Sequence, residues 1–180
     1  YKKCLEIGFG AGRLLNAATY LFDHAYGVDI HKHFDKTRSF LSNENYDLCL
    51  PGNMEEVVKD NSIDFVYSFI VLQHLDSIDT FLFYADQIQR VLKPGGVVNI
   101  YYGINKFNKE DYITIDYEKM QDRGSSLFLS PSYVENIFNQ KGLSTIKHDI
   151  ASKKPWLSSK TNPSNSQAFI VCKKQLITVE

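Results

Sequence analysis

A glycine-rich segment near the start of the chain has the residue types and spacing of a ligand-binding turn. It contains Gly8, Gly10 and Gly12, it follows an apolar run, and it precedes a segment with helical spacing. Glycine permits a sharp turn and lets a ligand approach the backbone N–H groups where a helix begins. Asp29 ends the next apolar run, where a carboxylate can accept hydrogen bonds from ribose hydroxyls. Together these residues indicate a site for a ligand that carries a ribose.

The glycine spacing distinguishes two kinds of ribose-containing ligand. The dinucleotide fingerprint GxGxxG requires its third glycine one position after Gly12, and that position is Arg13. The spacing therefore disfavours a nicotinamide dinucleotide. Asp29 taken alone also fits the N-cap of a following helix. Glu6 is the penultimate residue of the first apolar run; because an unpaired buried carboxylate is costly, we expect a ligand or a partner beside it.

The apolar patterns that surround these residues predict strands alternating with helices. Helical spacing predicts helices at residues 12–22, 33–41, 54–59 and 79–92, the third of them weak. Short apolar runs predict strands at residues 1–7, 25–30, 46–50, 63–69 and 97–102. Pro94, Gly95 and Gly96 are expected to end the longest helix. This alternation is typical of βαβ units around a parallel sheet.

The C-terminal part of the chain predicts one more helix and a hairpin. Ser130 fits the N-cap, Pro131 the first helical position and Gly142 the end of that helix. Residues 143–150 and 167–173 are the last two predicted strands. Between the two parts, residues 103–129 form the least regular segment. A connection of that length is typical of a lid, a binding loop or disorder.

Four segments, in this order, match one family. They are Cys4 to Leu14, Tyr26 to Ile30, Asn61 to Ser68 and Arg90 to Gly96. On these residues the chain resembles the class I S-adenosylmethionine-dependent methyltransferases, specifically over residues 1–102. The resemblance implies an α/β fold, a Rossmann-like three-layer sandwich whose mostly parallel seven-stranded sheet ends in a C-terminal antiparallel hairpin. It also implies one methyltransferase domain over residues 1–180, with S-adenosyl-L-methionine as the cofactor.

The resemblance implies a role for each residue that matches a family position. Glu6 and the glycine turn hold the methionine part of the cofactor, and Asp29 accepts hydrogen bonds from both ribose hydroxyls. Ile30 packs on the adenine, and the backbone of Ser68 receives the amino group of the cofactor. Many members have Asp where this chain has Asn53 at the adenine edge, but an amide oxygen can also accept from the adenine amino group. The implied cofactor-binding residues are Glu6, Gly8, Gly10, Gly12, Asp29, Ile30, Asn53, Met54 and Ser68.

Histidines and aromatic residues supply the other candidates. His74 follows the fourth predicted strand, on the side where the methyl group is expected. A neutral imidazole there can take a proton from an acceptor hydroxyl or amine, so we predict His74 as the catalytic base, with packing at a helix start as the alternative. His31 and His33 without a third ligand are more typical of a solvated surface, and we predict no metal site. Trp156 and the tyrosines of residues 103–129 either line an acceptor pocket or cover an edge of the core.

Composition and charge argue against nucleic acid as the acceptor. The 180 residues include 20 basic and 21 acidic side chains, a formal net charge of −1, whereas nucleic-acid-binding domains are strongly basic. Ser68 to Val71 stand where amino DNA methyltransferases of this broad family carry a Pro-Pro signature. No apolar run reaches the roughly 18 residues that cross a bilayer. The three cysteines, without CxxC spacing, predict buried free thiols in a reducing compartment.

We therefore predict a cytoplasmic enzyme that transfers the methyl group of S-adenosyl-L-methionine to an oxygen or nitrogen of a small-molecule acceptor. No nucleic acid or membrane is expected as a partner. The chain begins at Tyr1, directly at a predicted strand, and we expect an upstream segment to be missing. Two alternatives stay open. One is a non-catalytic binding subunit with the methyltransferase fold, and the less favoured one is an NAD(P)-dependent oxidoreductase.

Overall fold

A computed structural model describes residues 2–105, 110–115, 126–151 and 167–176. The strands are β1 (Lys3–Ile7), β2 (His24–Val28), β3 (Tyr46–Cys49), β4 (Ile63–Ser68), β5 (Leu92–Gly103), β6 (Tyr112–Thr114), β7 (Leu127–Leu129), β8 (Leu143–Ile150) and β9 (Gln167–Lys174). The helices are α1 (Arg13–Leu21), α2 (Phe34–Phe40), α3 (Met54–Val57), α4 (Ile78–Val91) and α5 (Pro131–Gln140). Short 3₁₀ turns cover Pro51–Asn53 and Leu72–His74.

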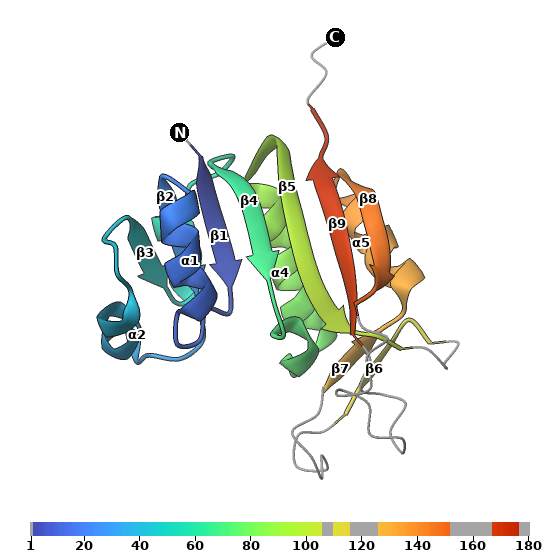
Figure 1. Cartoon of the computed structure of the whole chain (residues 1–180). Helices are drawn as coiled ribbons and strands as arrows, with labels where there is room; N and C mark the ends of the chain where they lie inside the picture. The colour runs from blue at the N-terminus through green and yellow to red at the C-terminus, as the bar shows by residue number, and fades with distance from the viewer. Residues whose placement is uncertain (1, 106–109, 116–125, 152–166, 177–180) are drawn as a thin grey trace.

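Seven of these strands form one sheet in the order β3-β2-β1-β4-β5-β9-β8. The first five run parallel, and β9 is antiparallel to both of its neighbours. Figure 1 shows α1 on one face of the sheet and α4 and α5 on the opposite face. The predicted α/β three-layer sandwich with a C-terminal antiparallel hairpin is confirmed. The strand order reverses at β1, and such a switch point is where open α/β sheets bind ligands, beyond the carboxyl ends of the strands.

The main hydrophobic core lies between the sheet and the helices α4 and α5. Phe81 and Ile88 of α4 and Phe138 of α5 are almost completely buried, as are Val66 and Ile100 of the central strands. Each such side chain contributes about 1.5–3 kcal/mol by burial. A second, smaller cluster packs α1 onto the other face. The two clusters fix the carboxyl ends of β1, β2 and β4 relative to one another, which a site at that edge requires.

The start of β5 differs from the prediction, whereas the end of α4 agrees with it to within one residue. α4 ends at Val91, just before Pro94, Gly95 and Gly96, but these three residues lie inside β5, which the apolar pattern predicts to start only at residue 97. Leu92 pairs with Ile63 of β4, and the register then shifts before the next pair. Proline and glycine are tolerated in a strand at such an irregularity. Pro94, Gly95 and Gly96 therefore lie after the end of α4 and at the irregularity in the pairing of β5 with β4.

Residues 103–129 contain regular structure that the sequence did not predict. β6 pairs antiparallel with β7 in a separate two-stranded sheet, and the three residues of β7 are buried. Strands of three residues are too short to give a periodic signal. Tyr117 and Trp156, expected near an acceptor, lie outside the described residues. The N-cap predicted for α5 is confirmed, because Ser130 Oγ accepts a hydrogen bond from the backbone N–H of Tyr133.

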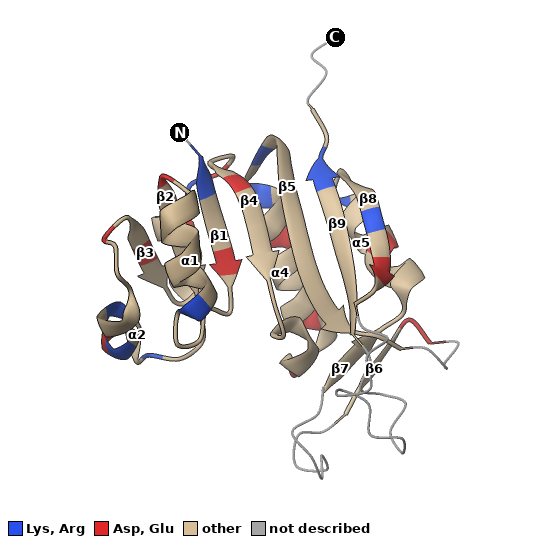
Figure 2. Cartoon of the chain, in the orientation of Figure 1, with Lys and Arg blue, Asp and Glu red and all other residues tan. Residues whose placement is uncertain are grey.

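Charges and thiols are distributed as the composition suggests. Figure 2 shows basic and acidic positions interspersed over the described elements. The cysteines Cys4, Cys49 and Cys172 are buried free thiols, as predicted. In the described part of the chain, no helix has both the length and the apolar character that a membrane span needs.

Candidate functional site

The turn between β1 and α1 has a left-handed backbone at each glycine. The φ angles of Gly8, Gly10 and Gly12 are 80°, 52° and 91°, a region that side-chain-bearing residues rarely adopt. A Cβ placed on Gly8 would lie 2.3 Å from Val71 Cγ2. A Cβ placed on Gly10 would meet no atom within 4 Å. Gly8 is therefore required by packing within the protein, whereas Gly10 borders open space that a ligand can enter.

Asp29 joins the end of β2 to this turn. Its Oδ2 accepts a hydrogen bond from the Gly10 backbone N–H at 2.7 Å, and its Oδ1 accepts one from the His31 backbone N–H at 3.2 Å. His31 Nε2 lies 2.9 Å from the Gly10 carbonyl oxygen, and Thr37 Oγ1 donates to the same oxygen at 3.2 Å. Each carboxylate oxygen has a second lone pair, so Asp29 keeps the capacity to accept from two ribose hydroxyls.

His31, whose sequence context favours a solvated surface over a metal ligand, contacts the glycine turn instead. Its ring holds the glycine turn by the contact with Gly10 and packs edge-on against Phe9 at a centroid distance of 5.1 Å. Among the described residues no group of three His, Cys, Asp or Glu side chains is placed to hold a metal. The sequence shows that His31 follows Asp29 by two positions. This spacing does not reveal that the imidazole contacts the glycine turn, because that contact depends on the folded structure.

The residues expected around an adenine lie in different environments. Ile30 follows Asp29 and is 79% exposed, so its side chain can cover a ligand bound at Asp29. Asn53 is exposed and its Nδ2 donates to Glu56 Oε2 at 3.2 Å. Met54 is completely buried in the main core, so its side chain packs below the surface. Their contacts with adenine stay predictions.

The end of β4 brings Ser68 and His74 to the same edge of the sheet as β1. Ser68 is buried, and its Oγ donates to the Ile7 carbonyl at 2.9 Å, which joins the ends of the two strands. Ile70, two residues later, has φ 58°, a strained conformation for a β-branched residue and one found most often near functional sites. His74 is exposed in the following 3₁₀ turn, with Nε2 3.1 Å from Gln73 Nε2.

Glu6 is a buried carboxylate beneath the turn. Its residue is only 3% exposed, and the Tyr67 hydroxyl donates to Oε2 at 3.1 Å. Burial raises the pKa of Glu6 to about 8, helped by the charge of Asp29 and opposed by the Tyr67 hydrogen bond and by Arg13. The expected partner of this carboxylate is therefore present, in the form of a neutral hydroxyl.

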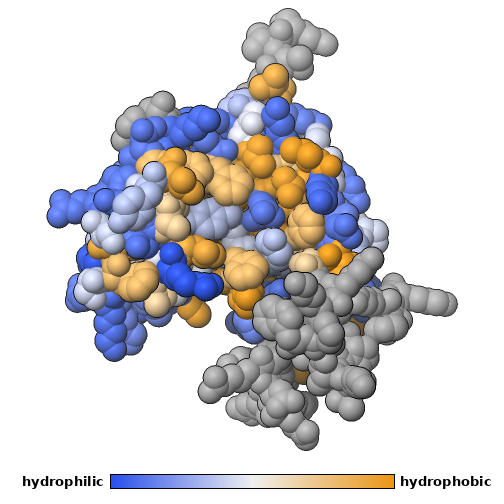
Figure 3. All heavy atoms as spheres, in the orientation of Figure 1, coloured by the Kyte–Doolittle hydropathy of each residue, from blue (hydrophilic) through white to orange (hydrophobic). Residues whose placement is uncertain are grey.

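A groove opens next to these residues, on the face of the sheet that carries α1. Figure 3 shows apolar side chains gathered over β4, β5 and β9 on this face. The groove encloses about 310 Å³, and its lining residues are Leu14, Phe65, Tyr67, Ser68, Phe69, Asn99 and Tyr101. Asn99 Oδ1 is buried with no hydrogen-bond partner in the part of the chain that the structure describes. A buried acceptor of this kind usually meets a ligand or an ordered water.

Comparison with known proteins identifies the family. Residues 5–100, more than half of the 180, match a family model described as a methyltransferase domain. The chain belongs to this methyltransferase family. Its fold is that of the class I methyltransferases, and the cofactor of the family is S-adenosyl-L-methionine. A search of curated proteins finds no significant match.

Solved structures share the fold of this methyltransferase domain at low sequence identity. A SAM-dependent methyltransferase from Methanosarcina mazei has 15% identity and a TM-score of 0.71, covering 97% of this chain and 92% of its own. A chain from the Haloferax volcanii complex between the Trm112 methyltransferase activator and the putative methyltransferase matches at 14% identity and a TM-score of 0.69. The match covers 99% of this chain and 84% of that chain. The Burkholderia thailandensis 1,6-didemethyltoxoflavin-N1-methyltransferase has 1,6-didemethyltoxoflavin and S-adenosylhomocysteine bound. It matches at 12% sequence identity and a TM-score of 0.69, covering 96% of this chain and 71% of its own.

The residues present fit S-adenosyl-L-methionine. Gly10 borders open space, Asp29 has free lone pairs at 13% side-chain exposure, and Ile30 is exposed beside it. Glu6 places a carboxyl group beneath the turn, where it suits the cationic methionine end of the cofactor. When bound, the cofactor supplies an electrophilic methyl group on its sulfonium.

The open space at Gly10 gives a first prediction. We expect Gly10→Ala to raise the dissociation constant of S-adenosylmethionine at least about tenfold, because the methyl group enters the ligand space. It also costs about 1 kcal/mol of unfolding free energy, because φ is positive. Gly95→Ala is the matched control, with φ 81° and ordinary van der Waals space around its Cβ. Calorimetric titration and urea unfolding of both variants test this. Equal loss of affinity in the two would refute it.

Proposed function

We propose that this protein transfers the methyl group of S-adenosylmethionine to an oxygen or nitrogen of a small-molecule acceptor. The observation that carries the proposal is the glycine turn, open at Gly10 and hydrogen-bonded to Asp29, within a chain that belongs to a methyltransferase family. The role of the protein is mainly to align donor and acceptor, an effect that contributes up to about 7–11 kcal/mol in favourable cases.

The residues of the site divide this work. Asp29 and the turn orient the cofactor, and Ser68 fixes the end of β4 against β1 through its bond to Ile7. The bound cofactor would supply the methyl group, its sulfur–methyl bond breaking to leave a neutral thioether as the new bond to the acceptor forms, and His74 would take the proton that the acceptor hydroxyl or amine loses. A base is more useful for a hydroxyl than for an amine, whose proton leaves readily after methylation.

Three observations support a small acceptor rather than a nucleic acid. The net charge is −1, and charges of both signs are interspersed over the elements (Figure 2). The groove beside Ser68 has a volume that suits a small molecule and aromatic walls, with Phe69 and Tyr101 edge to face at 5.0 Å. A neighbour of the same fold has a small heterocycle as its substrate.

The three free thiols fit a reducing compartment such as the cytoplasm.

Two measurements test the proposed function. Isothermal titration with S-adenosylhomocysteine is expected to show binding to the folded protein. Incubation with methyl-labelled S-adenosylmethionine and a panel of phenols, heterocyclic amines and carboxylic acids is expected to label at least one acceptor. Absence of binding by a well-folded sample would end the proposal. Binding without transfer to any acceptor would favour the alternative, a non-catalytic binding subunit.

The role of His74 can be separated from cofactor binding. We expect His74→Ala to lower turnover of a hydroxyl acceptor about 100-fold while the S-adenosylmethionine dissociation constant is unchanged. His33→Ala, which removes another exposed histidine, is the control and should keep full turnover. Initial rates with the best labelled acceptor, measured over a range of pH, provide the readout. Full turnover in His74→Ala would remove this residue from the mechanism.

A further inference from the structure

The pairing of Glu6 with Tyr67 has a consequence for cofactor binding. The two residues face each other across β1 and β4, in register. The hydrogen bond from Tyr67 is the only one to the Glu6 carboxylate within the described residues. A hydroxyl donates a hydrogen bond but no charge, so it only partly compensates a buried carboxylate. Burial also raises the pKa of Tyr67 far above its ordinary value, so its hydroxyl keeps its proton and stays a donor.

Among the residues that the structure describes, Glu6 has no ion pair, and Arg13 supplies the only favourable charge noted for it. From β2 the negative charge of Asp29 opposes ionisation, and from α1 the positive charge of Arg13 favours it. Cys4 of the same strand is a buried thiol whose pKa burial raises to about 12, so it stays neutral. Burial outweighs the favourable contacts and raises the pKa of Glu6 to about 8. In the free protein near pH 7 this carboxyl group is thus mostly protonated.

We propose that binding of S-adenosylmethionine expels a proton from Glu6, and that Tyr67 is the positioning residue that sets the pH at which this happens. The inference rests on the proposed function, because it needs the cofactor at this turn. The permanent positive charge of the sulfonium, together with the ammonium group, favours the ionised carboxylate in a site of low dielectric constant. The O–H bond of Glu6 breaks, its proton passes to solvent, and no other bond changes. Tyr67 acts through the hydrogen bond that its hydroxyl donates to the Glu6 carboxylate.

This linkage gives affinity a defined pH dependence. The ionised form of Glu6 is the competent form, and apparent affinity falls with the fraction of protein that holds it. The contribution of Glu6 to affinity therefore rises about tenfold for each pH unit below its pKa and levels off above it. At pH 7, with that pKa at about 8, Glu6 releases about 0.9 proton per bound cofactor, and at pH 9.5 almost none; the α-amino group of the cofactor, with an ordinary pKa of about 7.7–8.0, titrates in the same range and contributes equally in every variant.

The experiment is calorimetric titration of S-adenosylmethionine from pH 6 to 9.5, in pairs of buffers that differ in ionisation enthalpy. Tyr67→Phe removes the hydrogen bond that lowers the pKa of Glu6, so we expect its affinity profile to move about one pH unit toward alkaline values. It then binds about tenfold more weakly than wild type at pH 7 and nearly equally at pH 9.5. Glu6→Gln should lose the proton release that comes from Glu6. Tyr102→Phe, which removes a buried tyrosine hydroxyl of the next strand that is hydrogen-bonded to His148 and lies outside the groove lining, should keep the wild-type profile.

Each outcome has a defined meaning. Binding with no proton release near pH 7 would overturn the inference while leaving the proposed function intact. An equal loss of affinity at every pH in Tyr67→Phe would assign this residue a structural role only and would overturn it too. Absence of any binding by wild type would end both. If a variant fails to fold, a ¹³C NMR titration of Glu6 in the free wild-type protein decides: a midpoint near 8 supports the inference, and one near the ordinary 4.5 overturns it.

Discussion

Replacing Asp29 with alanine is expected to weaken S-adenosylmethionine binding about 100-fold. Two losses add. The carboxylate no longer accepts from the Gly10 and His31 backbone N–H groups, so the turn loses its attachment to β2. It also no longer accepts from the ribose hydroxyls. Hydrogen bonds to a charged group contribute about 1.5–3 kcal/mol each, so even the lower value for the two bonds on the ligand, about 3 kcal/mol, gives a loss of at least about 100-fold.

The matched control for this change is Asp35→Ala. Asp35 lies in the first turn of α2, its side chain is fully exposed, and its removal changes the net charge by the same amount. We expect its dissociation constant to stay within about threefold of wild type, since exposed charges are well screened. Titration calorimetry at fixed pH and salt compares the two. If Asp29→Ala bound nearly as tightly as Asp35→Ala, the proposed cofactor site would be wrong.

The elements that position this site could be read from the sequence because their signals are local. The strand, the glycine turn and the helix of residues 1–22 have separate patterns, and β1 and α1 form within them. β6 and β7 were missed because three-residue strands carry no period. The place of Leu92 in β5 was missed because its pairing with Ile63 is a tertiary contact. Local patterns predicted which elements exist, and long-range pairing fixed where they begin and end.

Site residues follow the same division. The placement of Glu6, Gly10 and Asp29 at the turn and the strand ends could be predicted, because these positions follow directly from the local pattern, while their contacts with the cofactor stay predictions. The ring of His31 on the Gly10 carbonyl and the hydroxyl of Tyr67 on Glu6 could not. The second contact needs the register of β1 against β4, with Glu6 opposite Tyr67, and a shift of one residue would turn Tyr67 to the other face. Sequence spacing alone does not determine that register.

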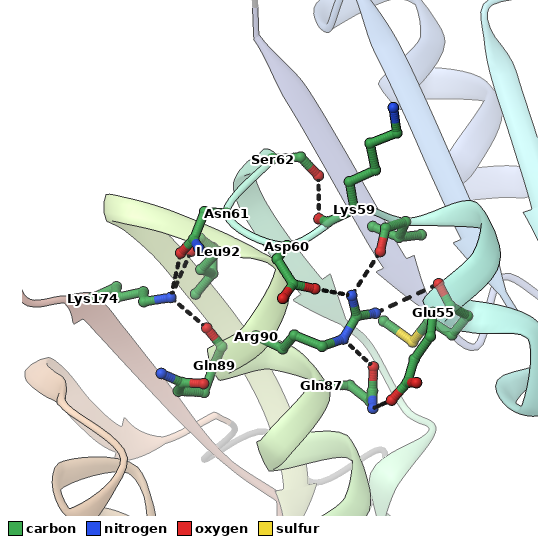
Figure 4. Close-up of polar contacts among 12 residues, drawn as sticks. Glu55, Lys59, Asp60, Asn61, Ser62, Gln87, Gln89, Arg90, Leu92 and Lys174 are labelled. Atoms are coloured by element: carbon green, nitrogen blue, oxygen red, sulfur yellow. Dashed lines mark hydrogen bonds and ion pairs between the residues drawn. The ribbon is translucent and has the colours of Figure 1, made fainter.

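Arg90 connects α4 to the segment that carries Asn53 and Met54, expected at the adenine edge. Figure 4 shows its guanidinium between α4 and the loop before β4. Its Nη1 donates to the Val58 carbonyl at 2.8 Å and to Asp60 Oδ1 at 2.6 Å, and its Nη2 donates to the Met54 carbonyl at 3.5 Å. The side chain is only 17% exposed. Arg90 therefore ties α4 to α3: it adds a second donor to the Met54 carbonyl, which already accepts from the Val58 backbone N–H, and it caps the carbonyl of Val58 that follows the helix.

Arg90→Ala is expected to lower the free energy of unfolding by about 3 kcal/mol, since partly buried carbonyls and Asp60 lose their donor together. Arg38→Ala is the control. Its side chain is 50% exposed and its partner Asp35 is fully exposed, so we expect a loss of no more than about 0.5 kcal/mol. Urea unfolding followed by circular dichroism measures both. Similar small losses in the two variants would show that α3 is held by apolar packing of Met54 and Val58 instead, and that the adenine edge does not depend on Arg90.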